Sequence, residues 1–228
     1  MANVPTHIGY IVDGNRRWAS ARGEPAYKGH IAGYKALKEV IQQTIDAGVR
    51  YTSLYVFSTE NWKRSSEEVD KLMGLLLTGL GQDLHIFTEN NIRIRFLGSK
   101  KGLSKAVVAA MSKAEAETCS FTGAEVLLCL NYGGQQEIVE AVKRIVDKAI
   151  ASDAIDEAMI ASELYAPDVP PCDLIVRTSG EQRLSNFMLW RSAYSELLFV
   201  DKNWPEMTKQ DVTDILEEYN NRARRFGG

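Results

Sequence analysis

Short apolar runs, separated by segments with helical periodicity, recur along the whole chain and constrain its fold more than any other feature. The runs expected to form buried strands are residues 7–12, 52–58, 92–98, 125–132, 173–179 and 196–201. Strands that alternate with helices in this way build a mainly parallel sheet. The sequence therefore predicts an α/β fold, in which residues 1–228 form a single domain with a six-stranded sheet flanked by helices on both faces.

The segments between the runs place apolar residues at the spacing of one helix face. Two such sets are Tyr34, Leu37, Ile41 and Ile45, and Ile138, Val142, Ile145 and Ala149. Between these sets, Ser65 and Glu68 have the spacing of a capping box, which predicts the start of a helix of about 25 residues. Residues 72–80 are apolar around much of this helix, a pattern typical of a helix buried on several sides.

Composition narrows the class of protein further. The 228 residues are 45% hydrophobic and carry a net charge of −3, which allows a large core and disfavours nucleic acid as the main partner. The widely spaced cysteines Cys119, Cys129 and Cys172 disfavour a disulfide framework or a zinc site and indicate buried thiols in a reducing compartment. No signal peptide is evident, and the most apolar window, 72–80, is much shorter than the roughly 20 residues that span a bilayer. We therefore expect a cytoplasmic protein.

Polar segments follow four of the predicted strands. They are residues 13–17, 58–62, 131–134 and 177–183. Because ligands bind beyond the carboxyl ends of parallel strands, we expect these segments to share one site. Arginine matches phosphate oxygens bidentately and glycine lets backbone N–H groups approach them, so the segments favour a phosphate-like ligand. Taken alone, the first segment is equally typical of an ordinary turn, since Asp-Gly and Gly-Asn are common turn dipeptides.

Motifs of several other enzyme classes are missing from the sequence. It contains neither G-x-x-x-x-G-K-[ST] nor G-x-G-x-x-G, the usual fingerprints of nucleotide binding. It also lacks the Gly-x-Ser-x-Gly and His-Glu-x-x-His motifs of hydrolases. A phosphatase of unrelated type would need a nucleophile or a metal cluster that the sequence does not reveal. The absence of these motifs is consistent with a reaction that needs no strong nucleophile.

Several blocks of the sequence resemble the cis-prenyltransferase family, whose best-known bacterial member is undecaprenyl diphosphate synthase. The blocks are Asp-Gly-Asn-Arg-Arg-Trp at 13–18, Gly-His at 29–30, Phe-Ser-Thr-Glu-Asn-Trp at 57–62, Asn-Tyr-Gly-Gly at 131–134, Arg-Thr-Ser-Gly-Glu-Gln-Arg-Leu-Ser-Asn-Phe at 177–187, Tyr-Ser-Glu-Leu at 194–197, Trp-Pro at 204–205 and Arg-Ala-Arg-Arg-Phe-Gly at 222–227. The resemblance runs from about His7 to the last residue, in the order and at the spacing of the family. The Asp-Asp-x-x-Asp motif of the all-helical trans-prenyltransferases is absent.

This resemblance implies a Mg²⁺-dependent enzyme that condenses isopentenyl diphosphate with an allylic diphosphate, with farnesyl diphosphate as the expected primer. It implies a long-chain product, undecaprenyl diphosphate for cell-wall synthesis, made by a homodimer with at most peripheral contact with a membrane. Residues 72–80 would then line a tunnel for the growing lipid tail. The alternatives are a short-chain or irregular-coupling synthase of the same family and a non-catalytic partner subunit. Such subunits typically lose the aspartate after the first strand, which this chain keeps as Asp13.

The resemblance also implies roles for individual residues. Asp13 is implied to coordinate Mg²⁺ on a diphosphate, Asn61 to help position or remove the proton, and Glu196 to be a second metal ligand across the dimer interface. The implied substrate-binding residues are Gly14, Asn15, Arg16, Arg17, Trp18 and His30 for the allylic diphosphate, Arg177, Arg183, Leu184 and Ser185 for isopentenyl diphosphate, and Ser58, Thr59, Glu60, Trp62 and Arg64 on a loop that closes over the substrates.

Three positions depart from the family pattern. Ala26 and Gln135 stand where the family usually or often carries arginine, and Val56 is bulkier than the alanine of a familiar long-chain member. The loss of one charged donor to a phosphate weakens binding by about 1.5–3 kcal/mol. These departures bear on the choice of primer and on product length, and they leave the reaction class unchanged.

The basic end of the chain allows two interpretations. Arg222, Arg224 and Arg225 form either a solvated, dipole-compensating end of the last helix or, as the resemblance implies, a tail that reaches the isopentenyl site of a neighbouring subunit.

Overall fold

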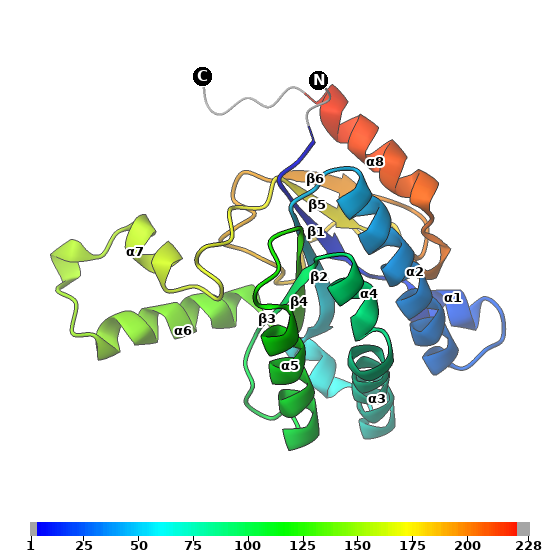
Figure 1. Ribbon diagram of the computed structural model, residues 1–228, viewed down its shortest axis with the longest axis horizontal. Helices are drawn as coiled ribbons and strands as arrows, with labels where there is room; N and C mark the ends of the chain where they lie inside the picture. The colour runs from blue at the N-terminus through cyan, green and yellow to red at the C-terminus, as the bar shows by residue number, and fades with distance from the viewer. Residues whose placement is uncertain (1–3, 223–228) are drawn as a thin grey trace.

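Six parallel strands form the centre of the structure, a computed structural model that describes residues 4–222. The strands are β1 (His7–Ile11), β2 (Tyr51–Ser58), β3 (Arg93–Leu97), β4 (Glu125–Tyr132), β5 (Leu174–Arg177) and β6 (Glu196–Phe199). They lie in the order β3-β4-β2-β1-β5-β6, and each neighbouring pair is parallel (Figure 1). The predicted α/β class with a parallel six-stranded sheet is therefore confirmed.

Helices connect the strands and carry much of the core. The α-helices of the described chain are α1 (Asn15–Ser20), α2 (Ala26–Asp46), α3 (Ser66–Gln82), α4 (Leu84–Glu89), α5 (Lys105–Thr118), α6 (Gly134–Asp147), α7 (Glu157–Ser162) and α8 (Lys209–Asn221). Short 3₁₀-helices are η1 (Thr59–Lys63), η2 (Ser152–Ala154) and η3 (Trp204–Glu206). The predicted apolar face of α2 turns inward, because Ile41 is buried and Leu37 and Ile45 pack against the same core.

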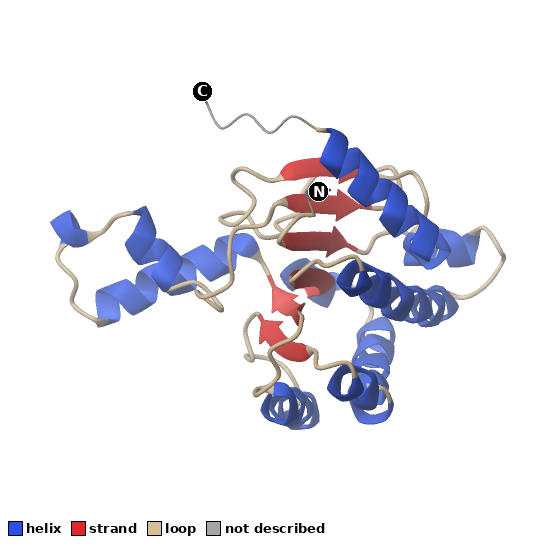
Figure 2. Cartoon of the chain, turned by 45° about the horizontal axis from the view of Figure 1, so that its top comes forward, coloured by secondary structure: helices blue, strands red, loops and turns tan. Residues whose placement is uncertain are grey.

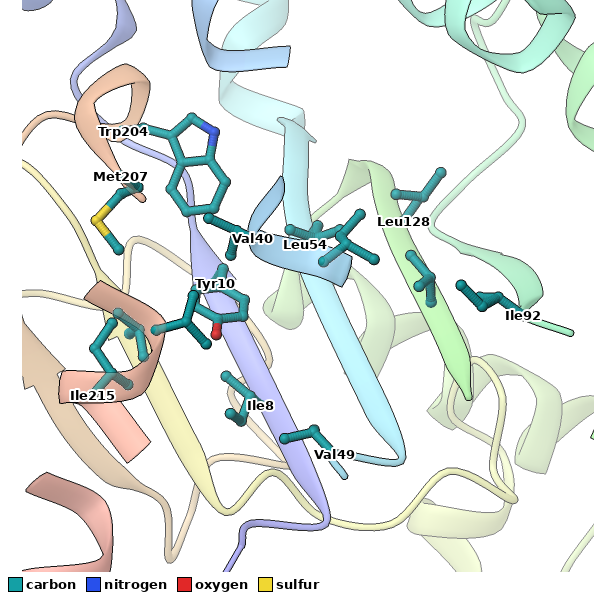
Figure 3. Packing of buried hydrophobic residues seen from close by; sticks show 14 of the residues in the cluster. Ile8, Tyr10, Val40, Val49, Leu54, Ile92, Leu128, Trp204, Met207 and Ile215 are labelled. Carbon is teal, nitrogen blue, oxygen red and sulfur yellow. The ribbon is translucent and has the colours of Figure 1, made fainter. Parts of the chain in front are cut away.

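The two faces of the sheet are covered in different ways. On one face, Tyr10 of β1, Val40 of α2 and Ile215 of α8 belong to one large cluster of buried apolar side chains (Figure 3). On the other face, Cys129 of β4 packs in a second cluster with Phe187 and other residues of the loops at 165–172 and 184–188. The main helical layer thus lies on one face, and irregular segments cover much of the other.

The third predicted helix starts where expected but is shorter than predicted. The Oγ of Ser65 accepts a hydrogen bond from the backbone N–H of Glu68 at 3.3 Å, as an N-cap should. The Glu68 carboxylate does not complete a capping box, because it contacts Arg64 and His30 instead. The helix ends at Gln82, and α4 begins after Asp83, so the predicted helix of about 25 residues is two helices.

Helix α6 presents apolar side chains away from the sheet. Of the predicted stripe, Ile145 is buried, but Val142 is 44% exposed and Ala149 lies beyond the end of the helix. Val139 and Val146 are also exposed, at 52% and 67%. Figures 1 and 2 show that α6 and α7 project from the rest of the molecule. An exposed apolar strip on a projecting helix is typical of a contact surface.

Two further features concern the state of the cysteines and the lengths of the helices. All three cysteines are free; Cys129 and Cys172 are buried, but Cys119 is exposed, so the expectation of three buried thiols is wrong for Cys119. Among residues 4–222, no helix has the length and apolar character needed to cross a membrane.

Candidate active site

The polar segments converge at the carboxyl-terminal edge of the sheet. Asp13 follows β1, Ser58 ends β2 and Arg177 ends β5, and β1 lies between the other two strands. These side chains share a polar cleft, as the strand-end rule predicted. The cleft is lined by Ile11, Val12, Asp13, Tyr55, Ser58, Glu60, Asn61, Arg64, Arg177, Ser185 and Asn186.

Asp13 is an ionised carboxylate held between two guanidinium groups. Its Oδ2 accepts hydrogen bonds from Nη2 of Arg177 at 2.9 Å and Nη2 of Arg17 at 3.1 Å. Burial by itself raises the pKa of Asp13, but the hydrogen bond from Arg177 and the charges of Arg17 and Arg177 lower it below its ordinary value. The next residue, Gly14, has φ +104°, and a Cβ there would lie 2.5 Å from Oδ1 of Asn203. The turn after β1 therefore requires glycine at this position.

Arg177 is a buried cation with donor capacity to spare. Only 4% of the residue is exposed, and its Nη1 donates to the backbone carbonyl of Arg183 and to Oγ of Ser185 at 2.7 Å. Its Nε has no hydrogen-bond partner among the described residues. Leaving a buried donor unsatisfied costs about 1–3 kcal/mol. The guanidinium group of Arg177 also lines the cleft, and its positive charge suits a phosphate group.

The loop after β2 is held over the cleft by specific hydrogen bonds. Oδ1 of Asn61 accepts from the backbone N–H of Ser58 at 3.0 Å, which closes η1 against the end of the strand. Trp62 donates from Nε1 to Oδ1 of Asn131 at 2.7 Å, yet 40% of it remains exposed. Glu60 accepts from Nδ2 of Asn186 at 3.1 Å. The loop is thus tied to the ends of β2 and β4 and to the loop after β5.

A second group of cations surrounds Glu68, beside the cleft. Its Oε1 accepts from Nη1 of Arg64 at 2.9 Å and lies 3.3 Å from Nε2 of His30, while Arg16 reaches its Oε2 at 4.0 Å. Burial lowers the pKa of His30, and the neighbouring Glu68 offsets this only in part. The sequence did not identify Glu68 as a site residue, because the capping-box pattern accounted for it fully.

An apolar cavity adjoins the polar cleft. Val12 lines both spaces, and Asn15 and His30 form a polar end of the cavity. Its walls come from α2, α3 and α4 on one side and from the sheet on the other. The lining includes Tyr34, Leu37, Val56, Leu72, Leu75, Leu76, Gly79, Leu80, Leu84, Phe87, Ile94 and Leu128. The apolar stretch 72–80 therefore lines a cavity, as the tunnel interpretation requires.

The remaining implied residues of the first helix and its turn lie around these two spaces. Arg16 is exposed over 63% of its side chain, and Trp18 is stacked against Arg22, whose guanidinium carbon lies 4.1 Å from the ring centroid. The Oδ1 of Asn15 is buried without a partner among the described residues. Thr59 approaches the backbone at Gly133, where a Cβ would lie 2.8 Å from its hydroxyl.

Two implied residues of the loop after β5 turn out to differ in exposure. Arg183 pairs with Glu181 at 2.5 Å, exposes 59% of its side chain and is not among the residues that line the cleft. Leu184 packs against the second core cluster and so anchors the loop to the core. Ser185 has φ +48°, a strained backbone conformation for a residue other than glycine.

Glu196 is not brought to the other site residues of the same chain. It begins β6 and pairs in register with Leu174, whereas Arg177, beside Asp13, pairs with Phe199 at the other end. Its Oε2 accepts from Nη1 of Arg222 at 3.2 Å. The predicted Arg224 and Arg225 lie outside the described residues.

Two further polar residues of the cleft were not predicted as site residues. The Tyr55 hydroxyl donates to the backbone carbonyl of Ser185 at 3.2 Å. Oδ1 of Asn186 accepts from the backbone N–H of Gln135 at 2.8 Å. This contact uses the backbone of Gln135, so it does not depend on the side chain that stands where the family often has arginine. Asn186 stood in a motif quoted for the resemblance, whereas Tyr55 lies inside a strand and no local pattern distinguishes it.

The side chains of the cleft suit a magnesium ion only if a substrate supplies further ligands to it. Among residues 4–222, no group of three or more His, Cys, Asp or Glu side chains could hold a metal by itself. Mg²⁺ is commonly bound by one or two carboxylates together with substrate phosphates. Asp13, ionised and at the polar cleft, fits that kind of site.

Comparisons with known proteins agree along nearly the whole chain. A family model described as "Putative undecaprenyl diphosphate synthase" matches residues 11–227. A protein of Thermotoga maritima named "Isoprenyl transferase" is 43% identical over 99% of this chain and 97% of its own length. A protein of the same name from Treponema denticola is 40% identical over 100% of this chain and 99% of its own length.

Solved structures show the same fold. The lavandulyl diphosphate synthase of Lavandula x intermedia, in complex with dimethylallyl diphosphate, superposes with a TM-score of 0.96 at 33% identity and covers 99% of both chains. A probable undecaprenyl diphosphate synthase from Campylobacter jejuni superposes with a TM-score of 0.84 at 31% identity, over 99% of this chain and 100% of that one.

Proposed function

Since the chain belongs to the undecaprenyl diphosphate synthase family and is a transferase of prenyl groups, we propose that it condenses isopentenyl diphosphate with an allylic diphosphate. The proposed enzyme is a Mg²⁺-dependent cis-prenyltransferase, acting as a single catalytic domain, with farnesyl diphosphate as primer. One observation carries the proposal: a cleft with Asp13 and buried Arg177 adjoins an apolar cavity across Val12. The first space suits a diphosphate and the second its hydrocarbon tail.

The chain's own cations would stabilise the leaving group. When the allylic C–O bond breaks, its electron pair leaves with the diphosphate, and Arg17, which binds Asp13, and Arg16 of the same helix would bind that charge. Asp13 would hold Mg²⁺, which when bound supplies further neutralisation of the diphosphate. The double bond of isopentenyl diphosphate forms the new C–C bond, and a proton is then lost. Asn61, which lines the cleft, is the proposed residue that helps position or remove this proton.

The two substrates would use different cations. His30, Arg64 and Arg16 lie together at the junction of cleft and cavity, where an allylic diphosphate can place its tail in the cavity. Arg177 and Ser185 lie deeper in the cleft and would bind the diphosphate of isopentenyl diphosphate. In the structure, Glu68 pairs with His30, Arg64 and Arg16. We therefore expect the Glu68 carboxylate to be displaced in part when the diphosphate binds.

A homodimer would account for two features of the surface. The exposed valines of α6, at 139, 142 and 146, form an apolar strip that a second copy could cover. Glu196 lies at the opposite end of β5 and β6 from Asp13 within one chain, so it can serve as a metal ligand only for another copy. Arg222, paired with Glu196, would accompany it to that site.

The proposed product is a long-chain undecaprenyl diphosphate used in cell-wall synthesis, made without nucleic-acid partners and with at most peripheral contact with a membrane. A short-chain or irregular-coupling synthase is the second candidate. The higher TM-score with the lavandulyl diphosphate synthase, 0.96 against 0.84 for the probable undecaprenyl diphosphate synthase, favours this alternative.

Product analysis tests the proposal directly. The purified protein is incubated with Mg²⁺, labelled isopentenyl diphosphate and primers of one, two or three isoprene units, and the products are separated by chromatography. We expect extension by several units, with a preference for primers longer than dimethylallyl diphosphate. Products that stop at ten or fifteen carbons would select the short-chain alternative, and no incorporation with any primer would reject both.

A further inference from the structure

The side chain of a tyrosine on α2 extends to the end of α3. Tyr34 lines the apolar cavity, and its hydroxyl donates to Oδ2 of Asp83 at 2.6 Å. Asp83 is the residue between α3 and α4, so the contact lies where the cavity wall changes from one helix to the next. The polar end of the cavity, at Asn15 and His30, lies near the start of α2 instead.

The acceptor of this hydrogen bond is itself held in place. Oδ2 of Asp83 also accepts from Nζ of Lys38 at 3.1 Å, and Nζ lies 5.1 Å from the centroid of the Tyr34 ring. The hydrogen bond from Tyr34 lowers the pKa of Asp83 below its ordinary value, and burial raises that of Tyr34. The pair is thus a neutral phenol bound to a carboxylate, which is stronger than a bond between neutral groups.

A glycine on α3 makes room for the phenol. A Cβ at Gly79 would lie 2.6 Å from the Tyr34 hydroxyl oxygen and 2.9 Å from its Cζ. Gly74, one and a half turns earlier on the same helix, would meet no described heavy atom within 4 Å. The two glycines therefore differ in purpose: Gly79 accommodates Tyr34 and Gly74 does not.

We propose that Tyr34, seated on Gly79 and tied to Asp83, limits the length to which the product tail can grow. This inference rests on the proposed function. A tail that starts at the diphosphate site enters the cavity near His30 and advances towards α4 as isoprene units are added. Leu84 and Phe87 of α4, the helix that follows Asp83, also line the cavity. Further growth must displace a ring that is bonded to a charged carboxylate, so condensation slows when the tail reaches it.

Product lengths of paired variants test the proposal. Tyr34→Ala removes the ring and should lengthen the main product by at least one isoprene unit, while Tyr34→Phe keeps the ring and should give lengths between the variant and wild type. Gly79→Ala displaces the phenol and should alter the length, whereas Gly74→Ala, the matched control, should not. Product lengths identical in Tyr34→Ala and wild type would overturn the proposal, and so would equal effects of the two glycine variants.

A binding series separates this inference from the reaction. Saturated alkyl diphosphates of increasing length are titrated calorimetrically into each protein. Affinity should rise by up to about fourfold per methylene until the tail meets Tyr34, and then level off. In Tyr34→Ala the plateau should begin at a longer chain; an unchanged plateau would contradict the inference. If the plateau shifts but no protein extends a primer, the proposed reaction fails while the role of Tyr34 as a length limit stands.

Discussion

The polar cleft and the apolar cavity meet at Val12, yet they are built in opposite ways. The cleft takes its side chains from short segments that directly follow strands, such as Asp13 and Arg177, and hydrogen bonds hold those side chains in place. The cavity takes its lining mainly from faces of long helices, such as Leu76 of α3, and packing shapes most of it. We therefore expect the reaction rate to depend on the cleft and the product length to depend on the cavity.

The two regions also differ in how much change they should tolerate. In the cleft, a charge that loses its partner is left partly buried, and a residue such as Gly14 has a backbone conformation that few others can adopt. In the cavity, the walls are mainly apolar and already leave open space, so a change of side-chain volume moves the boundary of that space. Variants in each region should therefore separate rate from length.

The largest expected effect comes from removing the carboxylate of the cleft. Asp13→Ala should lower turnover at least ~10²–10³-fold, the loss typical of removing one preorganised electrostatic group. The residual product should keep its wild-type length, because the cavity is unchanged. The measurement is the steady-state rate with labelled isopentenyl diphosphate, followed by chromatography of the products.

A matched variant removes a carboxylate–arginine pair elsewhere. Asp168 binds Arg95 through two hydrogen bonds, at 2.6 and 2.8 Å, and neither residue lines the cleft. Asp168→Ala should leave turnover near wild type. A near-normal rate in Asp13→Ala, with the circular dichroism spectrum of a folded protein, would refute the proposed role of Asp13.

A smaller effect on rate, and a clear one on length, should follow from filling the cavity. Leu76→Trp places a larger side chain in the cavity wall and should shorten the main product, while the first condensation proceeds at a rate close to wild type. The next residue, Leu77, packs against a core cluster that Leu76 also contacts but does not line the cavity, so Leu77→Trp is the control. Both variants carry an overpacking penalty of about 1–3 kcal/mol. Equal product profiles in the two variants would break the proposed division between rate and length.

The sequence predicted the cleft better than the cavity for a physical reason. Strand ends can be located from local patterns, and parallel strands bring their ends together, so Asp13, Ser58 and Arg177 could be assigned to one site. The contact of Tyr34 with Asp83 depends on how α2 and α3 cross, and no local pattern reports that crossing. Helix packing geometry is set by tertiary contacts.

Two errors of the sequence analysis have the same origin. The predicted long helix breaks at Asp83, whose carboxylate is bound by Tyr34 and Lys38 of α2, a partner helix that the local sequence does not reveal. The apolar spacing of α6 was real, but Val142 faces outward and not into the core. Periodicity identifies an apolar face without telling whether the same chain or a second copy covers it.

The smallest expected effect is a proton taken up at the junction of cleft and cavity. His30 faces Glu68, Arg64 and Arg16, and burial holds its pKa below the ordinary value, so it is largely neutral in the free protein at neutral pH. A bound diphosphate adds negative charge beside the ring and should raise that pKa. Linkage then requires diphosphate affinity to increase as the pH falls, since binding favours the protonated form. A shift of one pKa unit corresponds to at most about tenfold in affinity.

Calorimetry can isolate this proton from those of the ligand. Inorganic diphosphate is titrated between pH 6 and 8 in two buffers of different ionisation enthalpy, into wild type and His30→Gln. Diphosphate carries protons of its own, so the difference between the two proteins gives the share of His30. His7 cannot contribute, because burial lowers its pKa to about 4. We expect wild type to take up more protons than His30→Gln. Equal uptake would mean that His30 does not sense the diphosphate, and the proposed allylic site would then have to rest on Arg64 and Arg16 alone.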